Sequence, residues 1–148
     1  MQKAQYGILR FAKYKGPEIS NIEAHNERKK EKYASNPDID NSRRNLNYHL
    51  IEPVGKYRAE SNRLIEEYGC RTRKDSVRVV EVLITATPEF FKGKKKSEIR
   101  AYFQTALEFI KKYQDSETIL SAVVHMDEKT PHMHLSFVPI TQDGRLCA

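Results

Sequence analysis

The sequence predicts an α+β fold, in which an antiparallel sheet packs against helices on one face. Three features lead to this prediction: the strand-like segments are few and long, helical segments lie between them, and the chain ends in a candidate hairpin. A chain of 148 residues with 39% hydrophobic residues suits one ordinary domain with one core. We therefore expect residues 1–148 to form a single domain.

The first third of the chain predicts a strand, a helix and a loop. Residues 6–11 have the composition of a strand. Ser20 and Glu23 have the spacing of a capping box, so a helix is expected from Asn21 to about Tyr33. The polar segment 35–47 is rich in turn-forming residues and predicts a loop.

The middle of the chain predicts two helices around a central strand. Apolar residues recur at helical spacing over 57–68, and Gly69 follows where a left-handed cap is usual. Residues 77–86 are rich in β-branched side chains and predict a central strand. An amphipathic pattern over 99–113 predicts the last helix, which should pack on the sheet.

The end of the chain predicts a hairpin, with strands 119–126 and 132–139 joined by the short turn 127–131. Side chains alternate along the second strand, so one face should carry His132, His134 and Ser136. The other face should carry Met133, Leu135 and Phe137. We expect the apolar face to meet the helices and the histidines to stand on the wetter face.

Three histidines of this hairpin form the candidate metal site. His132 and His134 lie about 7 Å apart along the strand, and folding the turn back brings His125 beside them. Three imidazoles that leave coordination positions open suit a catalytic metal, because water or substrate must still bind. Imidazole alone suits zinc, copper, iron or nickel, so this spacing does not identify the ion.

Charge is distributed unevenly along the chain. There are 17 basic and 11 acidic residues through Val80, and 9 of each after it. A basic half predicts a polyanionic partner, of which nucleic acid is the commonest. Two cysteines in no metal or redox spacing and the absence of a secretory signal or a long apolar stretch predict a cytoplasmic protein with no membrane contact.

Three segments resemble the Mob/Pre plasmid mobilisation and recombination proteins, the MobV group of relaxases. The segment from His125 to His134, HMDEKTPHMH, is similar to the histidine motif of that family. The segments His25-Asn-Glu-Arg28 and 40–48, which ends in Asn-Leu-Asn-Tyr48, resemble two further motifs. Together they extend from residue 25 to residue 134.

The resemblance implies a fold, a metal and an activity. The fold would be the two-layer sandwich of the HUH endonuclease class, with a five-stranded antiparallel sheet. His125, His132 and His134 would hold Mn²⁺ or Mg²⁺, with Zn²⁺ as a further candidate. The activity would be nicking and rejoining of plasmid DNA at an origin of transfer through a covalent protein–5′-DNA intermediate, for conjugative mobilisation or recombination.

Four further residues are candidates for catalysis. The resemblance implies His25 as the nucleophile, with Tyr48 as its rival because tyrosine serves in most other relaxases. Arg28, three positions after His25 on the same helical face, is expected to clamp the phosphate. Glu81 interrupts an apolar strand, so we expect it to orient a catalytic histidine, with an exposed sheet position as the alternative.

Basic and amide side chains are expected to bind DNA and to set a salt-dependent affinity. The candidates are Arg43, Arg44, Asn47, Arg71, Arg73, Lys74 and Arg78, with the lysine run 92–96 as a peripheral contributor. The expected partner is single-stranded or supercoiled plasmid DNA at the origin of transfer. A coupling protein of a conjugation system is a further expected partner.

Two other functions remain open from the sequence: a zinc hydrolase that uses the three histidines on another substrate, and a non-catalytic basic DNA-binding module. Family members usually continue well past the hairpin. We therefore expect this catalytic domain to be truncated at its C-terminus, and dimerisation to depend on the region that would follow.

Overall fold

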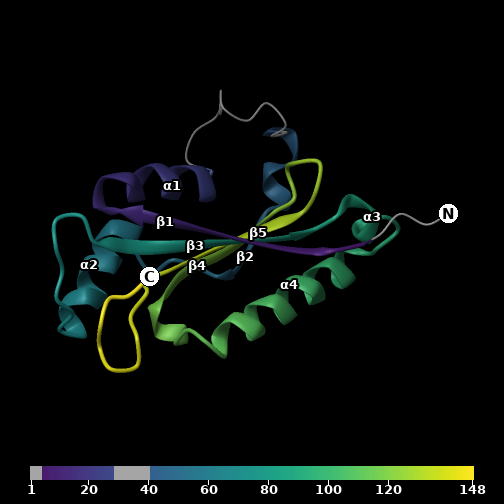
Figure 1. The fold of residues 1–148 in the computed structure, drawn as a ribbon. Coiled ribbons are helices and arrows are strands. Elements are labelled where there is room, and N and C mark those ends of the chain that lie inside the picture. The colour runs from purple at the N-terminus through teal and green to yellow at the C-terminus, as the bar shows by residue number, and fades with distance from the viewer. Residues whose placement is uncertain (1–4, 29–40) are drawn as a thin grey trace.

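A computed structural model describes residues 5–28 and 41–148 and shows a single antiparallel sheet between helices (Figure 1). Within these residues the sheet has five strands in the order β1-β3-β5-β4-β2, which confirms the predicted fold class. The strands are β1 (Gly7–Lys15), β2 (Tyr48–Ile51), β3 (Val77–Ala86), β4 (Ile119–His125) and β5 (His132–Phe137).

Helices of very different length connect the strands. The α-helices are α1 (Ile19–Asn26), α2 (Tyr57–Glu67), α3 (Pro88–Phe91) and α4 (Lys96–Lys111). The 3₁₀ turns are η1 (Gly16–Glu18), η2 (Asn41–Leu46) and η3 (Ser116–Thr118). Gly69, just past α2, has φ +67°, which confirms the predicted left-handed cap.

Pairing between the central strands fixes which residues share a face. Glu81 pairs with Ser136 and Leu83 with His134, whereas Val82 pairs with Leu135. Directly opposed residues lie on the same face, so Glu81, His134 and Ser136 share one face, together with Leu83, while Val82 and Leu135 share the other. The apolar face packs against Phe103 of α4, as the sequence predicts.

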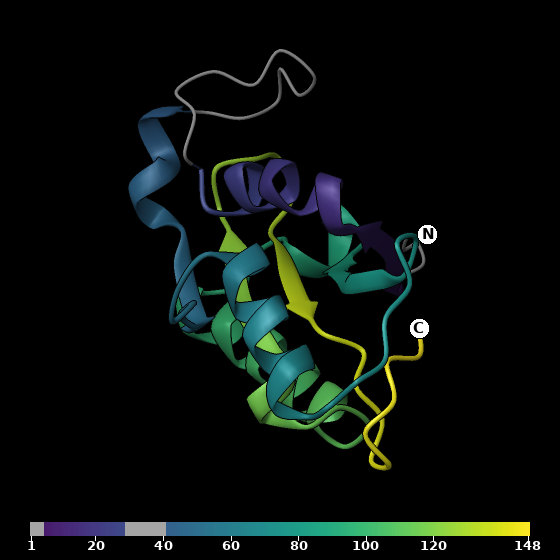
Figure 2. The same ribbon diagram turned by 90° about the vertical axis from the view of Figure 1, so that its left-hand side faces the viewer.

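The histidine face is covered as well, by α1 and α2, so the expectation of helices on one face alone is wrong. Ile19 of α1 and Tyr57 of α2, both fully buried, pack in one cluster with Val79 and Val138. These two valines lie at one end of the histidine face, and their burial requires a cover. Figure 1 shows α1 and α4 on opposite sides of the sheet, and Figure 2 shows the same layers from the side.

The segment before β2 differs most from prediction. Helix α1 begins at Ile19, and Glu18 is its N-cap. The predicted capping box of Ser20 and Glu23 is wrong. The capping-box contact is made instead by Glu18, whose carboxylate accepts from the amide of Lys15 at 3.1 Å. The helix ends at Asn26, well before the predicted end, and residues 29–40 lie outside the described part of the chain. The predicted loop contains η2 and leads directly into β2, which the sequence did not reveal.

Candidate metal centre and active site

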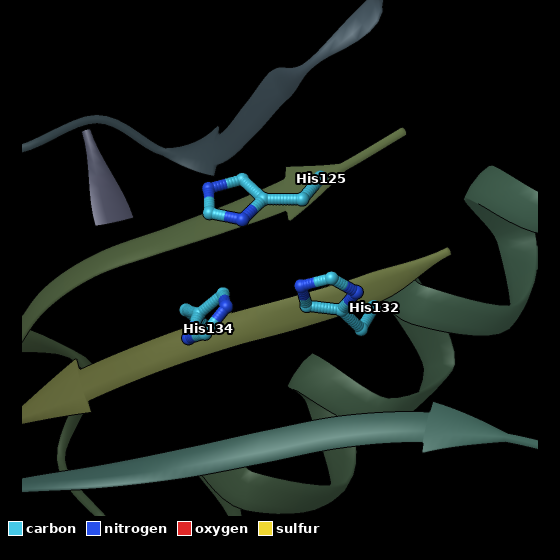
Figure 3. A group of neighbouring side chains, drawn as sticks. All are labelled: His125, His132 and His134. Carbon is cyan, nitrogen blue, oxygen red and sulfur yellow. The ribbon is translucent and has the colours of Figure 1, made fainter. Parts of the chain in front are cut away.

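His125, His132 and His134 lie together on two neighbouring strands. His125 on β4 pairs directly with His132 on β5, and the three ring centroids are 4.7–5.3 Å apart. Figure 3 shows the three rings gathered on the same side of these strands. One nitrogen from each ring lies within 4.8 Å of the others, a spacing that suits a single ion. The side chains are buried rather than exposed, because α1 covers this part of the face.

Each ring has one nitrogen held by an acceptor. His125 Nε2 donates to the main-chain oxygen of Asn26 at 2.6 Å, and His132 Nδ1 donates to that of Thr130 at 3.0 Å. His134 Nδ1 donates to the carboxylate of Glu81. These contacts fix the donor nitrogens and orient the rings, as acceptors behind metal-bound imidazoles do.

The opposite nitrogens are left for a ligand. His125 Nδ1 and His134 Nε2 are buried and have no hydrogen-bond partner among the described residues, while His132 Nε2 lies 3.3 Å from Glu128 Oε2. Two buried imidazole nitrogens without partners are costly unless a group is bound there. The three nitrogens therefore fit a divalent cation.

The surroundings of His125 and His132 favour the neutral form of these two rings, which is the form that binds metal. Burial, followed by the positive charges of His134 and Arg28, lowers the pKa of His125 far below its ordinary value. Burial, followed by the charge of His134, also lowers the pKa of His132. Since a metal competes with protons for the same lone pairs, low pKa values favour metal binding at neutral pH.

Glu81 lies directly behind this cluster. Its carboxylate accepts from His134 and, at 3.4 Å, from the hydroxyl of Tyr14 on β1. Burial alone would raise the pKa of Glu81, but the hydrogen bond and charge of His134 outweigh it and the pKa lies below its ordinary value. Burial and the charge of Glu81 raise the pKa of Tyr14 to about 12, so this hydroxyl stays a donor. Tyr14 carried no signal in the sequence.

His25 extends from the last turn of α1 toward the histidine cluster. Its ring centroid is 5.7 Å from that of His134 and 6.3 Å from that of His125. Burial, followed by the positive charges of His134 and Arg28, lowers the pKa of His25. The ring is thus neutral at neutral pH and carries the lone pair that nucleophilic attack requires.

Arg28 lies two residues beyond the end of α1, in the left-handed region with φ 50°, so it does not share a helical face with His25. Its guanidinium makes a bidentate contact with Asp127, at 2.9 and 2.8 Å, and reaches Glu128 at 2.9 Å. Both the guanidinium and Asp127 are almost fully buried. Arg28 therefore ties the end of α1 to the turn between β4 and β5.

Glu27 also attaches the end of α1 to the rest of the protein. It accepts from His49 of β2 at 2.6 Å, from Ser121 of β4 at 3.1 Å and from the hydroxyl of Tyr57. The carbonyl of the preceding residue, Asn26, is the one that holds His125. Main-chain contacts of this kind have no sequence signal.

Tyr48 lies on the opposite side of the sheet from the histidines. It pairs with Val124, which belongs to the apolar face, and its ring contacts the guanidinium of Arg100 on α4 at 4.8 Å. The two candidate nucleophiles are thus separated by the sheet, and only His25 lies beside the histidine cluster.

The candidate DNA-binding residues fall into two groups. Arg43, Arg44 and Asn47 lie in or next to η2, and Asn47 Oδ1 accepts from the amide of Met126, next to His125, at 2.6 Å. The second group lies before and at the start of β3, whereas the histidine cluster lies beside the end of that strand. This group consists of Arg71, Arg73, Lys74 and Arg78. The structure does not bring the two groups together. The lysine run connects α3 to α4, and its last residue, Lys96, is the first residue of α4.

A groove of about 560 Å³ opens beside His25, His132 and His134. The rest of its lining combines apolar side chains with polar ones: Ile8, Leu83, Ala86 and Pro88, and Thr85, Glu128, Lys129 and Thr130. The groove is large enough for part of a nucleotide chain. Among the described helices, none combines the length and apolarity needed to cross a membrane.

Comparison with known proteins gives one consistent result. The family model described as plasmid recombination enzyme (Mob_Pre) matches residues 3–148. Plasmid recombination enzyme type 1 of Staphylococcus aureus is 39% identical over 148 residues, which cover 97% of this chain and 36% of that protein. The plasmid recombination enzyme of Bacillus thuringiensis is 37% identical over 147 residues, covering 97% and 33%. The chain thus spans about a third of the length of these relatives.

Solved structures give the same result. The MobM relaxase domain (MOBV; Mob_Pre), in an Mn-bound crystal structure with plasmid pMV158 oriT DNA, superimposes with a TM-score of 0.89 at 32% identity. The match covers 97% of this chain and 74% of that one. Both the sheet and its helices are therefore shared with a DNA-bound relaxase domain.

Proposed function

Since the chain belongs to the Mob/Pre family of plasmid recombination enzymes, we propose that it nicks and rejoins one strand of plasmid DNA at an origin of transfer. The reaction proceeds through a covalent protein–DNA intermediate and serves conjugative mobilisation or plasmid recombination. The observation that carries this proposal is the group of three imidazoles with oriented rings and His25 beside them.

His125, His132 and His134 would hold the divalent cation, Mn²⁺ or Mg²⁺, as the manganese in the MobM structures supports. When bound, such an ion acts as a Lewis acid on a non-bridging phosphate oxygen and neutralises charge as phosphorus becomes pentacoordinate. Glu81 fixes the orientation of His134, and the carbonyl of Asn26 fixes that of His125.

His25 would be the nucleophile. A lone pair of its neutral ring forms a P–N bond with the scissile phosphorus, the P–O3′ bond breaks, and the leaving 3′ oxygen takes a proton to become a free hydroxyl. The 5′ end stays on the protein as a phosphoramidate, so the reverse reaction with a 3′ hydroxyl rejoins the strand. Tyr48 lies across the sheet, which supports His25 over Tyr48.

Arg28 would act by position. Because its guanidinium is held by Asp127 and Glu128, we assign it to fixing the end of α1, and hence His25, against the β4–β5 turn, in place of the expected phosphate clamp. The bidentate pair provides the geometric definition that this task requires. Asp127 and Glu128 are themselves part of a second group that could hold a cation with His125.

The phosphates of the DNA would bind to the basic side chains of the protein. Phosphate contacts from arginine and lysine release counterions, so rising salt should weaken origin binding steeply. An affinity that does not change with salt would contradict the assignment. For the whole protein, we also propose action in the cytoplasm and contact with the coupling protein of a conjugation system. Dimerisation would use sequence that is found in the longer relatives.

A cleavage assay tests the proposal. Supercoiled plasmid that carries the cognate origin is incubated with the protein with and without Mn²⁺, and we expect relaxed circles with attached protein only when the metal is present. His25→Ala should form no adduct, while Tyr48→Phe should still form one that mass analysis places on His25. Binding without cleavage at any metal concentration would instead indicate a plain DNA-binding module. An adduct in His25→Ala but not in Tyr48→Phe would overturn the nucleophile assignment.

A further inference from the structure

A pocket on the opposite face from the histidines has no part in the chemistry described above. It has a volume of about 230 Å³ and lies between η2, β2 and the first turns of α4. It is lined by Leu46, Tyr48, Lys96, Ser97, Arg100 and Met126. Leu46 and Met126 provide apolar walls, while the lysine and the arginine add positive charge. Such a combination suits a flat, partly apolar group attached to an anion.

Tyr48 is the central residue of this pocket. The guanidinium of Arg100 lies over its ring, 4.8 Å from the centroid. Its hydroxyl oxygen is buried and has no hydrogen-bond partner among the described residues. A buried phenol normally finds a partner, so this one calls for an explanation. A ligand that carries hydrogen-bond acceptors would supply the partner.

The pocket is adjacent to the candidate active site along the chain. Met126, which lines it, directly follows His125, and its amide donates to Asn47 at the junction of η2 and β2. Strand β2 is one of the two edges of the sheet, so a nucleic-acid strand can pass around it from one face to the other. Arg43 and Arg44 of η2 lie at this edge.

We propose that this pocket binds one nucleotide of the single-stranded plasmid DNA, with its base against Tyr48 and its phosphate near Lys96. The idea rests on the proposed function, because it takes that DNA as the ligand. Bases stack on aromatic rings whatever their identity, and the guanidinium of Arg100, which lies over the ring, adds a second flat surface. A contact away from the scissile phosphate would hold the strand while the P–O3′ bond is broken and reformed.

Binding measurements without cleavage test this pocket. We would measure fluorescence anisotropy of a labelled single-stranded origin oligonucleotide in EDTA, where no nicking occurs. Tyr48→Leu, which removes the ring, should weaken binding by roughly tenfold, the scale of one lost stacking contact. Lys96→Gln should weaken it more than Lys112→Gln, which removes the same charge at the other end of the same helix.

Cross-linking adds a readout that does not depend on affinity. An oligonucleotide with 5-iodouracil at successive positions, irradiated on the protein, should give an adduct on Tyr48 or Met126 at one position. Adducts confined to the groove beside His25, or equal effects of Lys96→Gln and Lys112→Gln, would overturn the proposal. Should Tyr48→Leu fail to fold, the two lysine variants still decide, because both side chains are exposed.

The two proposals fail separately. If no plasmid is nicked but binding still depends on Tyr48 and Lys96, the proposed function is wrong and the pocket stands. If nicking depends on His25 while the pocket variants bind like the unaltered protein, the pocket is wrong and the proposed function stands.

Discussion

The two faces of the sheet are both buried, but they are buried in different ways. Toward α4, residues such as Val82, Leu135 and Phe103 form an apolar core. Toward α1 and the start of α2, the sheet carries Glu81 and the three histidines, and the acceptors of these histidines come from three different parts of the chain. One face therefore supplies stability, whereas the other holds polar groups in fixed orientations and supplies the chemistry.

The largest effect is expected from removing a ligand on the histidine face. His125→Ala should abolish measurable Mn²⁺ binding, because the most deeply buried ring of the three is lost. The loss should exceed the ~100-fold upper range seen for residues behind a ligand. Calorimetric titration of Mn²⁺ measures it, and His49→Ala, which removes a histidine on the same face that holds Glu27 and is not a ligand, should weaken Mn²⁺ binding far less. Binding that survives His125→Ala would remove this ring from the site.

A substitution on the apolar face is expected to change the stability of the fold rather than metal binding. Phe103 is fully buried under the sheet, so Phe103→Ala should lower the free energy of unfolding by about 3–5 kcal/mol. Denaturant unfolding followed by circular dichroism measures the loss. The fraction that remains folded should bind Mn²⁺ with unchanged affinity. A weakened metal site in that fraction would show that the two faces are not independent.

A substitution of Glu81 tests how much the fixed orientation of His134 contributes to metal affinity. Glu81→Gln keeps the side-chain size but removes the charged acceptor of His134, so Mn²⁺ affinity should fall by about 10- to 100-fold. Tyr14→Phe is the matched control, since it removes a longer, 3.4 Å contact to the same carboxylate and should cost less. Equal losses in both variants would argue against an orienting role for the carboxylate.

The smallest effect is expected far from both faces, at the end of α2. Gly69 has φ +67° and open space where a Cβ would be, so Gly69→Ala should cost only backbone strain, roughly 1–2 kcal/mol. Thermal unfolding measures this loss, and Mn²⁺ affinity should not change. A variant as stable as the original chain would mean that the left-handed cap is not required.

The parts of the fold that depend on local patterns were predictable. Strand alternation placed His132 and His134 together, the short turn brought back His125, and the bounds of β3 at Val77–Ala86 agree with the prediction. In each case neighbours along the chain determine the arrangement. The mid-strand carboxylate at Glu81 also gave a usable signal, because a buried charge needs a partner.

The parts that depend on distant contacts were not predictable. Helix α1 ends at Asn26 because Glu27 and Arg28 are bound by residues about 22 to 100 positions further along the chain. The face on which Tyr48 lies follows from its pairing with Val124 in a strand that carries an irregularity. The packing of α1 over the histidines cannot be predicted from residue types. The same holds for the contact between the carbonyl of Asn26 and His125.

A count of imidazoles around one bound ion tests the three-histidine metal site most directly. Manganese-loaded protein is examined by X-ray absorption and pulsed electron paramagnetic resonance, with ¹⁵N-labelled histidine. We expect one ion per chain with three histidine nitrogens in its coordination shell. An ion bound by fewer than three imidazoles, or none bound at this hairpin, would contradict the account.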